Sequence, residues 1–374
     1  MFFIDSRRPI SVSMVKILLI THRYYPDIGG IESVSHMLSD SFHRAGYDVR
    51  VITWTAETGT KTFPYRIVRN PTLGQIIAQL KWADVVFENN PSLRMSWPNL
   101  VIDKPHVTAL HTWISRPTGE KKLVDHLKLS LLNRSDIVTA CSTAMKENCY
   151  PKAVVVTNPY DDKTFRRIDS VKRNKDLVFL GRLVSDKGAT ILVQAFHQIL
   201  TNERRRGTSS IRTLTIIGDG PERAQLEADV ARFGIGEHVT FTGSLRDEAL
   251  TRELNKHRCM VIPSLWQEPF GVVALEGMAC GCIPIVSKVG GLPDAIGNAG
   301  LTFMRGAVDS LVDAIYSIFD NPSFEVELRQ LAIAHLAAHH QDVIAGKYLA
   351  LVEQALKHHK RTHTNDPLRQ VDTV

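Results

Sequence analysis

Short apolar runs alternate with longer amphipathic stretches over most of this 374-residue chain, and this alternation restricts the fold more than any other feature. Runs such as Val15–Ile20 and Leu177–Leu180 have four to six residues, and apolar residues at helical spacing follow many of them. Strands that are apolar on both faces suit a parallel sheet covered by helices on both sides. The alternation therefore predicts an α/β protein built from strand–helix units.

The alternation stops once, at the polar and proline-containing stretch Asn158–Asp162, and then restarts. We therefore expect two Rossmann-like domains, at 15–159 and 160–340, each a doubly wound parallel sheet. Ligands of such sheets bind at the carboxyl ends of the strands, so the site should lie in the cleft between the domains. Outside the domains we expect an N-terminal tail at 1–14, a C-terminal helix at 341–358 and a disordered tail at 359–374.

The net charge of +6 belongs entirely to residues 1–159, which hold 19 Lys and Arg against 13 Asp and Glu. A basic half suggests an anionic partner such as a membrane surface, a phosphorylated acceptor or nucleic acid; a solvated surface with a mild excess of charge explains it equally well. No run approaches the ~20 apolar residues of a membrane-spanning helix. The first residues also lack the apolar core of a signal peptide, so we expect a cytoplasmic protein.

Two glutamates eight positions apart, Glu268 and Glu276, lie in the stretch Ser264–Ile285. Glu268 is expected in a loop at the carboxyl end of a strand, and Glu276 one to two turns into the helix that follows. Carboxylates at this edge of a sheet, beside the N–H groups of a helix start, suit a hydroxyl-rich ligand with an anionic part.

Two cations, Arg182 and Lys187, follow the first strand of the second half at another strand-to-helix junction. There they can neutralise a diphosphate, with Arg182 binding two oxygens and Lys187 acting as a point charge. The alternative is a pair of solvated surface cations.

Three glycine-containing turns follow predicted strands. Gly29-Gly30 opens a helix, where a ligand can approach the backbone and the helix N-terminus attracts an anion; a tight turn is the alternative. It does not match the dinucleotide pattern G-x-G-x-x-G, which disfavours an NAD-binding domain. The second turn contains Gly218 and Gly220, and the third contains Gly243 and Leu245. Either turn could bring the backbone close to a nucleotide, and an ordinary tight turn is the alternative for both.

His111 ends a predicted strand of the first domain, and it either donates a hydrogen bond to a sugar hydroxyl or is an ordinary loop histidine. The helix expected at about 120–133 combines the apolar residues Leu123, Leu127 and Leu131 with several lysines. We interpret the leucines as a buried stripe of an ordinary amphipathic helix, with a membrane-facing or acceptor-facing helix as the alternative.

The five cysteines include one close pair, Cys280 and Cys282, without a second pair or nearby histidines. We interpret them as small buried residues in a helix-to-strand turn and not as a metal site.

Taken together, these motifs resemble the retaining glycosyltransferases of family 4, which have the GT-B fold. The segment EPFGVVALEGMACGCIPIV is similar to the family's E-x₇-E signature, and the other motifs match in order from about Lys16 to Ala350. They are Pro26-x-x-Gly29-Gly30, His111, Ser142, Asn158–Asp161, Gly181-Arg182-Leu183 with Lys187-Gly188, Gly218-x-Gly220-Pro221 and Gly290-Gly291-Leu292-Pro293.

The resemblance implies a role for each matching residue. Arg182 and Lys187 would bind the donor diphosphate, and Gly30 would approach the same phosphates from the first domain. Glu268 would hold donor-sugar hydroxyls and Glu276 the ribose. The remaining expected donor contacts are His111 near the anomeric carbon and the backbone of Gly29, Gly218, Gly220, Gly243, Leu245, Pro269, Phe270 and Gly271.

The resemblance further implies a hexosyltransferase that uses a nucleotide-diphosphate-sugar donor and no metal, and a final helix that crosses back to the first domain. We expect same-face attack by the acceptor hydroxyl with retention at the anomeric carbon. No nucleic-acid partner is expected, and peripheral contact with an anionic membrane would involve the basic first domain. Two positions depart from the family pattern, since Pro159 stiffens the linker and Asp294 stands where the family often has Glu.

Two other functions fit the same residues. One is a GT-B epimerase or hydrolase that acts on a sugar nucleotide without an acceptor. The other is a non-catalytic nucleotide-sugar-binding protein, which the intact set of Arg182, Lys187, Glu268 and Glu276 disfavours. The donor base, the sugar and the acceptor do not follow from the sequence; the acceptor is expected at loops 54–64 and 89–104.

Overall fold

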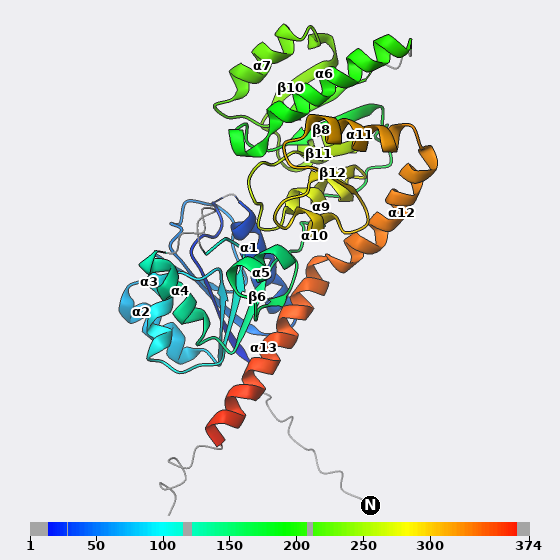
Figure 1. Ribbon diagram of the computed structural model, residues 1–374. Helices are drawn as coiled ribbons and strands as arrows, with labels where there is room; N and C mark the ends of the chain where they lie inside the picture. Colours follow the sequence, from blue (N-terminus) through cyan, green and yellow to red (C-terminus); the bar gives the residue numbers. More distant parts are fainter. Residues whose placement is uncertain (1–13, 28, 115–121, 208–211, 365–374) are drawn as a thin grey trace, which may run out of the picture.

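The structure is a computed structural model that describes residues 14–27, 29–114, 122–207 and 212–364. Within these ranges it contains two parallel sheets, each flanked by helices on both faces (Figure 1). The predicted fold class, two facing Rossmann-like domains, is confirmed. The predicted tail at 1–14 lies outside the described residues except for Met14, as do residues 365–374.

The first sheet has the strand order β3-β2-β1-β4-β5-β6-β7. Its described strands are β1 (Lys16–Thr21), β2 (Asp48–Thr53), β3 (Arg66–Arg69), β4 (Val85–Asn89), β5 (His106–Leu110), β6 (Ile137–Ala140) and β7 (Val154–Val155). The helices between them are α1 (Gly30–Arg44), α2 (Leu73–Trp82), α3 (Leu93–Ser96), the 3₁₀ helix η1 (Trp97–Leu100), α4 (Leu123–Leu132) and α5 (Thr143–Cys149).

The second sheet has the order β10-β9-β8-β11-β12-β13. Its strands are β8 (Lys175–Leu180), β9 (Leu214–Ile217), β10 (Val239–Gly243), β11 (His257–Ile262), β12 (Ile283–Ser287) and β13 (Leu301–Phe303). The helices are η2 (Ser185–Lys187), α6 (Ala189–Arg206), α7 (Arg223–Arg232), η3 (Gly236–His238), α8 (Asp247–Asn255), α9 (Val272–Ala279), α10 (Leu292–Ile296), α11 (Val308–Phe319), α12 (Pro322–Ala338) and α13 (Gln341–Thr364).

Apolar side chains cover both faces of each sheet, as a doubly wound fold requires. Along β1, Ile17 and Leu19 join one core cluster and Leu18 and Ile20 join the cluster on the opposite face. This is the period-two alternation of a strand buried on both sides. All four side chains are fully buried, which explains why a continuous apolar run marks this strand in the sequence.

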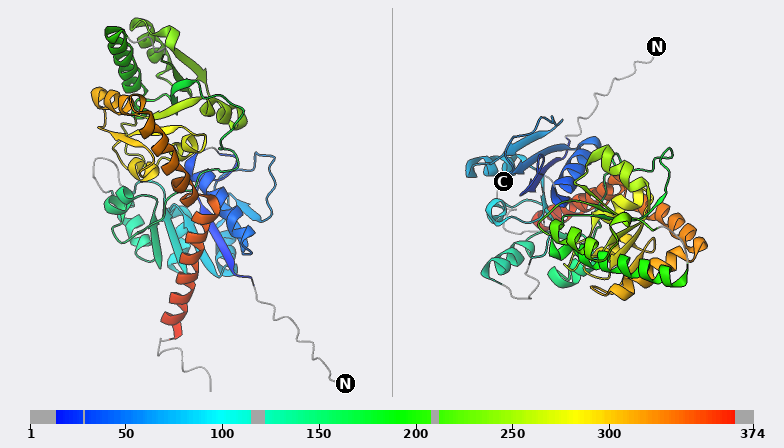
Figure 2. Two further views of the ribbon diagram at one scale, coloured as in Figure 1. Left: turned by 90° about the vertical axis from the view of Figure 1, so that its right-hand side faces the viewer. Right: turned by 90° about the horizontal axis from the view of Figure 1, so that it is seen from above.

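The last helix, α13, lies against the first domain although it follows the second in sequence (Figure 2). Its residues Ile344, Tyr348 and Val352 are buried in the core of the first domain. The disordered tail predicted from His359 is wrong for residues 359–364, because α13 continues to Thr364. No proline interrupts the helix before Pro367, and His359 pairs with Asp103 of the first domain at 3.9 Å.

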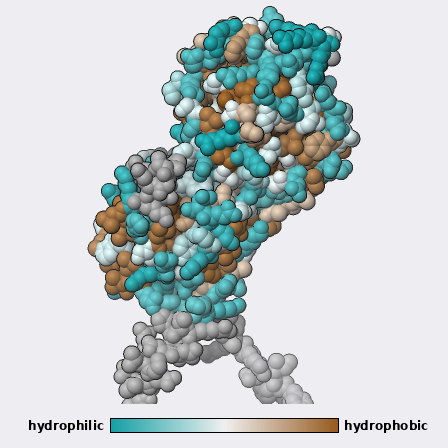
Figure 3. Space-filling view, viewed as in Figure 1, coloured by the Kyte–Doolittle hydropathy of each residue, from teal (hydrophilic) through white to brown (hydrophobic). Residues whose placement is uncertain are grey.

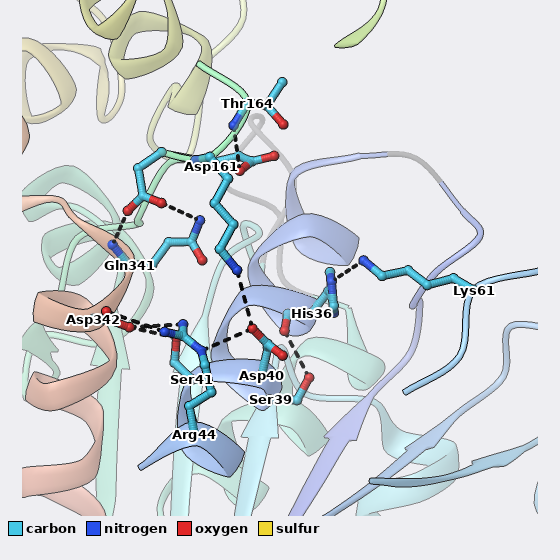
Figure 4. A network of polar contacts seen from close by, with 12 residues as sticks. His36, Ser39, Asp40, Ser41, Arg44, Lys61, Asp161, Thr164, Gln341 and Asp342 are labelled. Atoms are coloured by element: carbon cyan, nitrogen blue, oxygen red, sulfur yellow. Dashed lines mark hydrogen bonds and ion pairs between the residues drawn. The ribbon is translucent and has the colours of Figure 1, made fainter. Parts of the chain in front are cut away.

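Polar contacts join α1, α13 and the linker between the domains (Figure 4). Arg44 of α1 pairs with Asp342 of α13 at 3.0 Å, and Asp40 of α1 pairs with Lys163 of the linker at 3.8 Å. The side-chain amide of Gln341 donates to a carboxylate oxygen of Asp162 at 3.1 Å. The linker and the start of α13 are thus tied to the same helix of the first domain.

An apolar cluster also continues from one domain into the other. It contains Leu110, Cys141 and Met145 of the first domain together with Phe270 and Leu292 of the second. The predicted cysteine pair, Cys280 and Cys282, belongs to this cluster; both side chains are buried and neither forms a disulfide. The domains therefore share a core at the edge where the two sheets face each other.

Candidate active site

The strand order of the second sheet reverses between β8 and β11, and the predicted donor residues follow the strands on both sides of this point. Arg182 and Lys187 come after β8, and Glu268 comes after β11. Connections leave in opposite directions from such a pair of strands, which opens a crevice at their carboxyl ends. The fold therefore brings these side chains to the expected ligand edge.

Lys187 and Glu268 meet at this edge. The Lys187 Nζ donates to Glu268 Oε1 at 2.5 Å, and the Ser264 hydroxyl donates to the same oxygen at 2.9 Å. The side chains of Lys187 and Glu268 are 25% and 15% exposed, so ligand and solvent can still reach them. The second carboxylate oxygen of Glu268 accepts no hydrogen bond from a described residue and is the acceptor left for a ligand hydroxyl.

Arg182 is exposed, and its guanidinium makes no hydrogen bond or ion pair with any residue that the structure describes. An arginine without a carboxylate partner at a ligand edge keeps its full positive charge for an anion. The site therefore combines one cation that is already neutralised, Lys187, with one that is not.

The glycines after β8 and β9 are required by the backbone itself. Gly218 has φ 142° and Gly220 has φ 158°, and a Cβ on either would collide with the carbonyl oxygen of Gly181 or Leu183. The turn after β9 is thus packed directly on the turn after β8. Close backbone packing explains these glycines, and their contact with a nucleotide stays a prediction.

Gly243 lies beside this pair of turns, since its carbonyl accepts from Gly218 N at 2.9 Å. Leu245 packs with its partly buried side chain against the apolar cluster shared by the domains. Both residues lie near the β8–β9 turns, and their predicted contact with the donor is not tested.

The loop 267–271, which carries Glu268, is held by the first domain. The Trp113 ring N–H donates to the Gln267 carbonyl at 2.6 Å, and the Ser142 hydroxyl donates to the Pro269 carbonyl at 2.7 Å. Asp294 of α10 accepts from Thr143 N at the start of α5. Two segments of the first domain therefore hold, through hydrogen bonds, the part of the second domain that carries the candidate sugar-binding carboxylate.

Within the second domain the same loop is held through its backbone, since Gly291 N donates to the Glu268 carbonyl at 2.8 Å. The Phe270 side chain is 2% exposed and belongs to the shared apolar cluster. It anchors the loop, so only the backbone around Phe270 and Gly271 is available to a donor.

His111 follows β5 and is 5% exposed. Burial lowers the pKa of its imidazole to about 4, although nearby Asn158 acts in the opposite direction. Neither ring nitrogen has a hydrogen-bond partner of normal geometry among the described residues. The imidazole therefore carries no charge near neutral pH, and because both nitrogens are buried, its contact with a donor sugar stays a prediction.

Asn90 shapes the loop around His111, and no sequence pattern indicated this role. Its side-chain oxygen accepts from the backbone N–H of His111 at 3.2 Å and from Thr112 N at 3.1 Å. An asparagine after a strand is common in turns, so its position alone could not separate this role from an ordinary turn residue.

Glu276 lies on α9, beyond Glu268 along the chain. Burial, together with the negative charge of Asp161 in the linker, raises the pKa of its carboxyl group to about 7. The structure brings Glu276 close to the linker between the domains. Its proposed contact with a ribose is a prediction.

The N-terminus of α1 has no side-chain cap, and Gly29 precedes it. A Cβ on Gly30 would meet nothing within 4 Å, so the space above this residue is open. The buried carboxylate of Glu32 folds back toward Gly29 and already supplies negative charge to this helix start. An anionic ligand at Gly30 would therefore share the helix terminus with Glu32.

Within the described ranges, no three His, Cys, Asp or Glu side chains gather closely enough to hold a metal ion. No helix in the same ranges is both long and apolar enough to cross a membrane. Metal independence of the reaction stays a prediction.

Comparisons with known proteins agree with this geometry. Two family models match successive parts of the chain, Glycosyltransferase Family 4 over residues 28–161 and Glycosyl transferases group 1 over residues 161–335. An uncharacterized glycosyltransferase of Methanocaldococcus jannaschii is 27% identical over 330 residues, which span 75% of this chain and 83% of that protein. Glycogen synthase of Mycobacterium tuberculosis is 25% identical over 369 residues, 83% of this chain and 87% of that protein.

Solved structures show the same fold at low sequence identity. Sucrose-phosphate synthase from Thermosynechococcus elongatus has a TM-score of 0.73 and 20% identity, with 92% of this chain and 100% of that chain covered. The Anabaena protein HepE in complex with UDP and glucose has a TM-score of 0.70 and 19% identity, with 91% and 99% covered. With both halves matched by family models, the chain belongs to the group 1 glycosyltransferases of the GT-B fold.

Proposed function

We propose that this glycosyltransferase moves a hexose from a nucleotide-diphosphate-sugar donor to an acceptor hydroxyl, with retention at the anomeric carbon and without a metal. The observation that supports it most is the gathering of Arg182, Lys187 and Glu268 at the point where the second sheet reverses its strand order. Cations suited to a diphosphate there adjoin a carboxylate suited to sugar hydroxyls. HepE, which shares the fold, binds UDP and glucose.

The ion pair of Lys187 with Glu268 favours same-face attack over double displacement. Double displacement needs a carboxylate nucleophile beneath the anomeric carbon. A carboxylate that accepts hydrogen bonds from Lys187 and Ser264 is a weak nucleophile, because both donors stabilise its charge. The leaving diphosphate would then help to deprotonate the acceptor, and Arg182 and Lys187 would stabilise the charge that develops on it.

The acceptor belongs to a polysaccharide, glycolipid or other glycoconjugate pathway under this proposal. The acceptor hydroxyl would approach from the first domain, on the side of His111. The proposal includes a cytoplasmic protein whose basic first domain contacts an anionic membrane peripherally.

A thermal-shift screen with UDP-, GDP-, ADP- and dTDP-sugars identifies the donor, and transfer assays with that donor test the site. Arg182→Ala and Glu268→Ala are each expected to lower transfer by about a hundredfold or more, because each removes a group that acts directly on the donor. Arg205→Ala is the matched control, since Arg205 is also exposed but lies at the far end of α6. Full activity in both site variants, or binding of NAD(P) alone, would refute the proposal.

Incubation of the donor without acceptor separates transfer from the other reactions of such a site. We expect slow release of free sugar and no epimer. Rapid formation of either product would instead indicate an epimerase or a hydrolase.

A further inference from the structure

Two neighbouring segments of the first domain expose large apolar side chains to solvent. Val101, which follows η1, is 78% exposed, and Leu123 at the start of α4 is 77% exposed. Four more apolar side chains of these segments are exposed by 42–50%, namely Trp97, Leu100, Val124 and Leu127. We call these six residues the η1–α4 surface. Single exposed apolar residues are common, but a continuous patch indicates an interaction site.

The exposure corrects the sequence-based interpretation of α4. We expected Leu123, Leu127 and Leu131 to form a buried stripe, but only Leu131 is buried. Helical spacing shows that a helix has an apolar face and not what covers that face. In the first half of α4 the apolar side chains of Leu123, Val124 and Leu127 are thus left exposed.

The two segments form one surface. α3, which leads into η1, packs against α4, and the Arg134 guanidinium after α4 donates to the Leu100 carbonyl at 3.0 Å. Figure 3 shows apolar residues over this flank of the first domain, in the area where Figure 1 labels α2, α3 and α4. A hollow of about 460 Å³ between α2 and η1, lined by Trp54, Leu73 and Trp97 among others, extends the apolar area.

The η1 segment is firmly anchored, so its exposed side chains are not those of a loose loop. The buried carboxylate of Glu88 accepts from Ser92 N at 3.0 Å and pairs with His106 at 3.3 Å, and it also accepts from the Ser96 hydroxyl. On the other side of η1, the Lys104 ammonium donates to the Ala83 carbonyl at 2.6 Å. The apolar side chains are thus displayed at fixed positions.

Positive charge surrounds this apolar surface. The described residues between 90 and 135 contain five Lys and Arg against two Asp and no Glu. Arg94, Lys122 and Arg134 are exposed. The carboxylate of Asp125 caps the start of α4 by accepting from Lys122 N at 2.9 Å and is buried, so it does little to offset these cations at the surface.

We propose that the η1–α4 surface docks on the anionic face of a lipid bilayer. Leucine, valine and tryptophan side chains would enter the boundary between headgroups and acyl chains, while Arg94, Lys122 and Arg134 contact anionic headgroups. An anionic bilayer presents negative headgroups directly above an apolar interior, and this arrangement matches a fixed apolar surface bordered by cations.

The inference rests on the proposed function in one respect, because docking would bring the transfer site to a lipid-linked acceptor. η1 follows β4, and Asn90 at the end of β4 holds the loop of His111. The docking surface and the acceptor side of the cleft are therefore joined by one short, hydrogen-bonded segment. The acceptor class that follows is a hydroxyl-bearing headgroup or glycan on a membrane lipid.

Co-sedimentation of the full chain with vesicles tests the proposal. We expect binding to vesicles of phosphatidylcholine with about 30% phosphatidylglycerol, weaker binding to phosphatidylcholine alone, and loss of binding as salt rises. Leu123→Asp with Leu127→Asp should weaken binding at least about tenfold, because one buried large apolar side chain is worth more than that factor. The matched control is Val326→Asp with Ile333→Asp on α12, which are 56% and 72% exposed and should leave binding unchanged.

The charge contribution has its own pair of variants. Lys122→Glu should weaken binding to the anionic vesicles several-fold and leave binding to neutral vesicles unchanged, whereas Arg205→Glu on α6 should alter neither. All six substitutions are at exposed positions, so the variants are expected to fold, and circular dichroism checks this.

Several results would overturn the inference. One is the absence of binding to either kind of vesicle, and another is equal binding to neutral and anionic vesicles. A third is an equal loss of vesicle binding in the α4 and α12 variants. A dimer in sedimentation velocity that the α4 variant converts to monomer would show that the surface pairs two copies of the chain. Donor binding in the thermal-shift screen is a separate readout: its failure with intact vesicle binding would refute the proposed function and not the docking surface.

Discussion

Removal of the Ser142 hydroxyl tests whether the first domain positions the loop 267–271. The side chain is fully buried and makes two hydrogen bonds. It caps α5 by accepting from Met145 N at 3.2 Å, and it donates to the Pro269 carbonyl of the other domain at 2.7 Å. In Ser142→Ala both bonds are lost, and the Pro269 carbonyl keeps only the weak Cys141 thiol donor at 3.4 Å.

The expected cost follows from these two bonds. Loss of an N-cap hydroxyl costs about 1 kcal/mol, and loss of a buried hydrogen bond with an acceptor left unsatisfied costs about 1 kcal/mol more. Thr72→Ala is the matched control, because Thr72 caps α2 by accepting from Gln75 N but is exposed and contacts no residue of the second domain. We therefore expect about 2 kcal/mol of destabilisation for Ser142→Ala and about 1 kcal/mol for Thr72→Ala.

Urea unfolding and donor kinetics measure the two effects separately. The interdomain bond lies next to Glu268, so Ser142→Ala should raise the KM for the donor by about fivefold, the equivalent of ~1 kcal/mol, while Thr72→Ala leaves it unchanged. Equal destabilisation by the two substitutions, with an unchanged donor KM in both, would refute a positioning role for Ser142.

Three further predictions concern the second domain. Gly218→Ala should cost about 2–3 kcal/mol in urea unfolding, because φ is 142° and the new Cβ meets a carbonyl oxygen, whereas Gly74→Ala on α2 should be neutral or stabilising. The pKa of the Glu276 carboxyl group is about 7 in the folded protein and near 4.5 in the unfolded chain. The free energy of unfolding therefore falls as the pH rises through this window, because the folded protein keeps a proton that the unfolded chain has lost. Glu276→Gln lacks this loss, so its free energy of unfolding should exceed that of the parent by up to about 3 kcal/mol between about pH 5 and about pH 8, measured by urea unfolding at each pH. If Glu276 binds ribose as a carboxylate, nucleotide affinity by calorimetry should fall below about pH 7 in the parent and stay flat in Glu276→Gln. Lys187→Met should weaken UDP or another donor diphosphate by about tenfold in the same assay, and unchanged affinity would remove Lys187 from the phosphate site.

The fold was predictable because strands such as β1, β9 and β12 are buried on both faces, which gives each of these three a largely apolar run. β13 (Leu301–Phe303) escaped this criterion, since it is a three-residue edge strand and Thr302 is exposed. The short helices α5 and α10 were also missed, because seven and five residues do not complete two turns of apolar periodicity. Length, more than chemistry, limited the prediction of elements.

The candidate site was predictable in part, because strand order alone carries Lys187 and Glu268 to neighbouring strand ends. The ion pair between them joins residues 81 positions apart and has no local signature. The hydrogen bond from the Trp113 ring N–H to the Gln267 carbonyl could not be predicted either, because every residue has a backbone carbonyl and the sequence does not show which one accepts. Burial of His111 likewise depends on residues distant in sequence, such as Asn90 and Asn158, which no single strand or helix encodes.

The orientation of the domains should depend on their shared apolar core and little on the ion pairs at the linker. The pair of Arg44 and Asp342 is 43% and 58% exposed, and exposed pairs contribute about 0.2–1 kcal/mol. Phe270, by contrast, is 2% exposed in the core common to both domains, and truncation of such a side chain costs about 3–5 kcal/mol. Arg44→Ala and raised salt should therefore shift the unfolding midpoint slightly, while Phe270→Ala should separate the unfolding of the two domains in calorimetry. A single unfolding transition in Phe270→Ala, together with separate unfolding of the domains in Arg44→Ala, would show that the linker contacts fix the orientation of the domains.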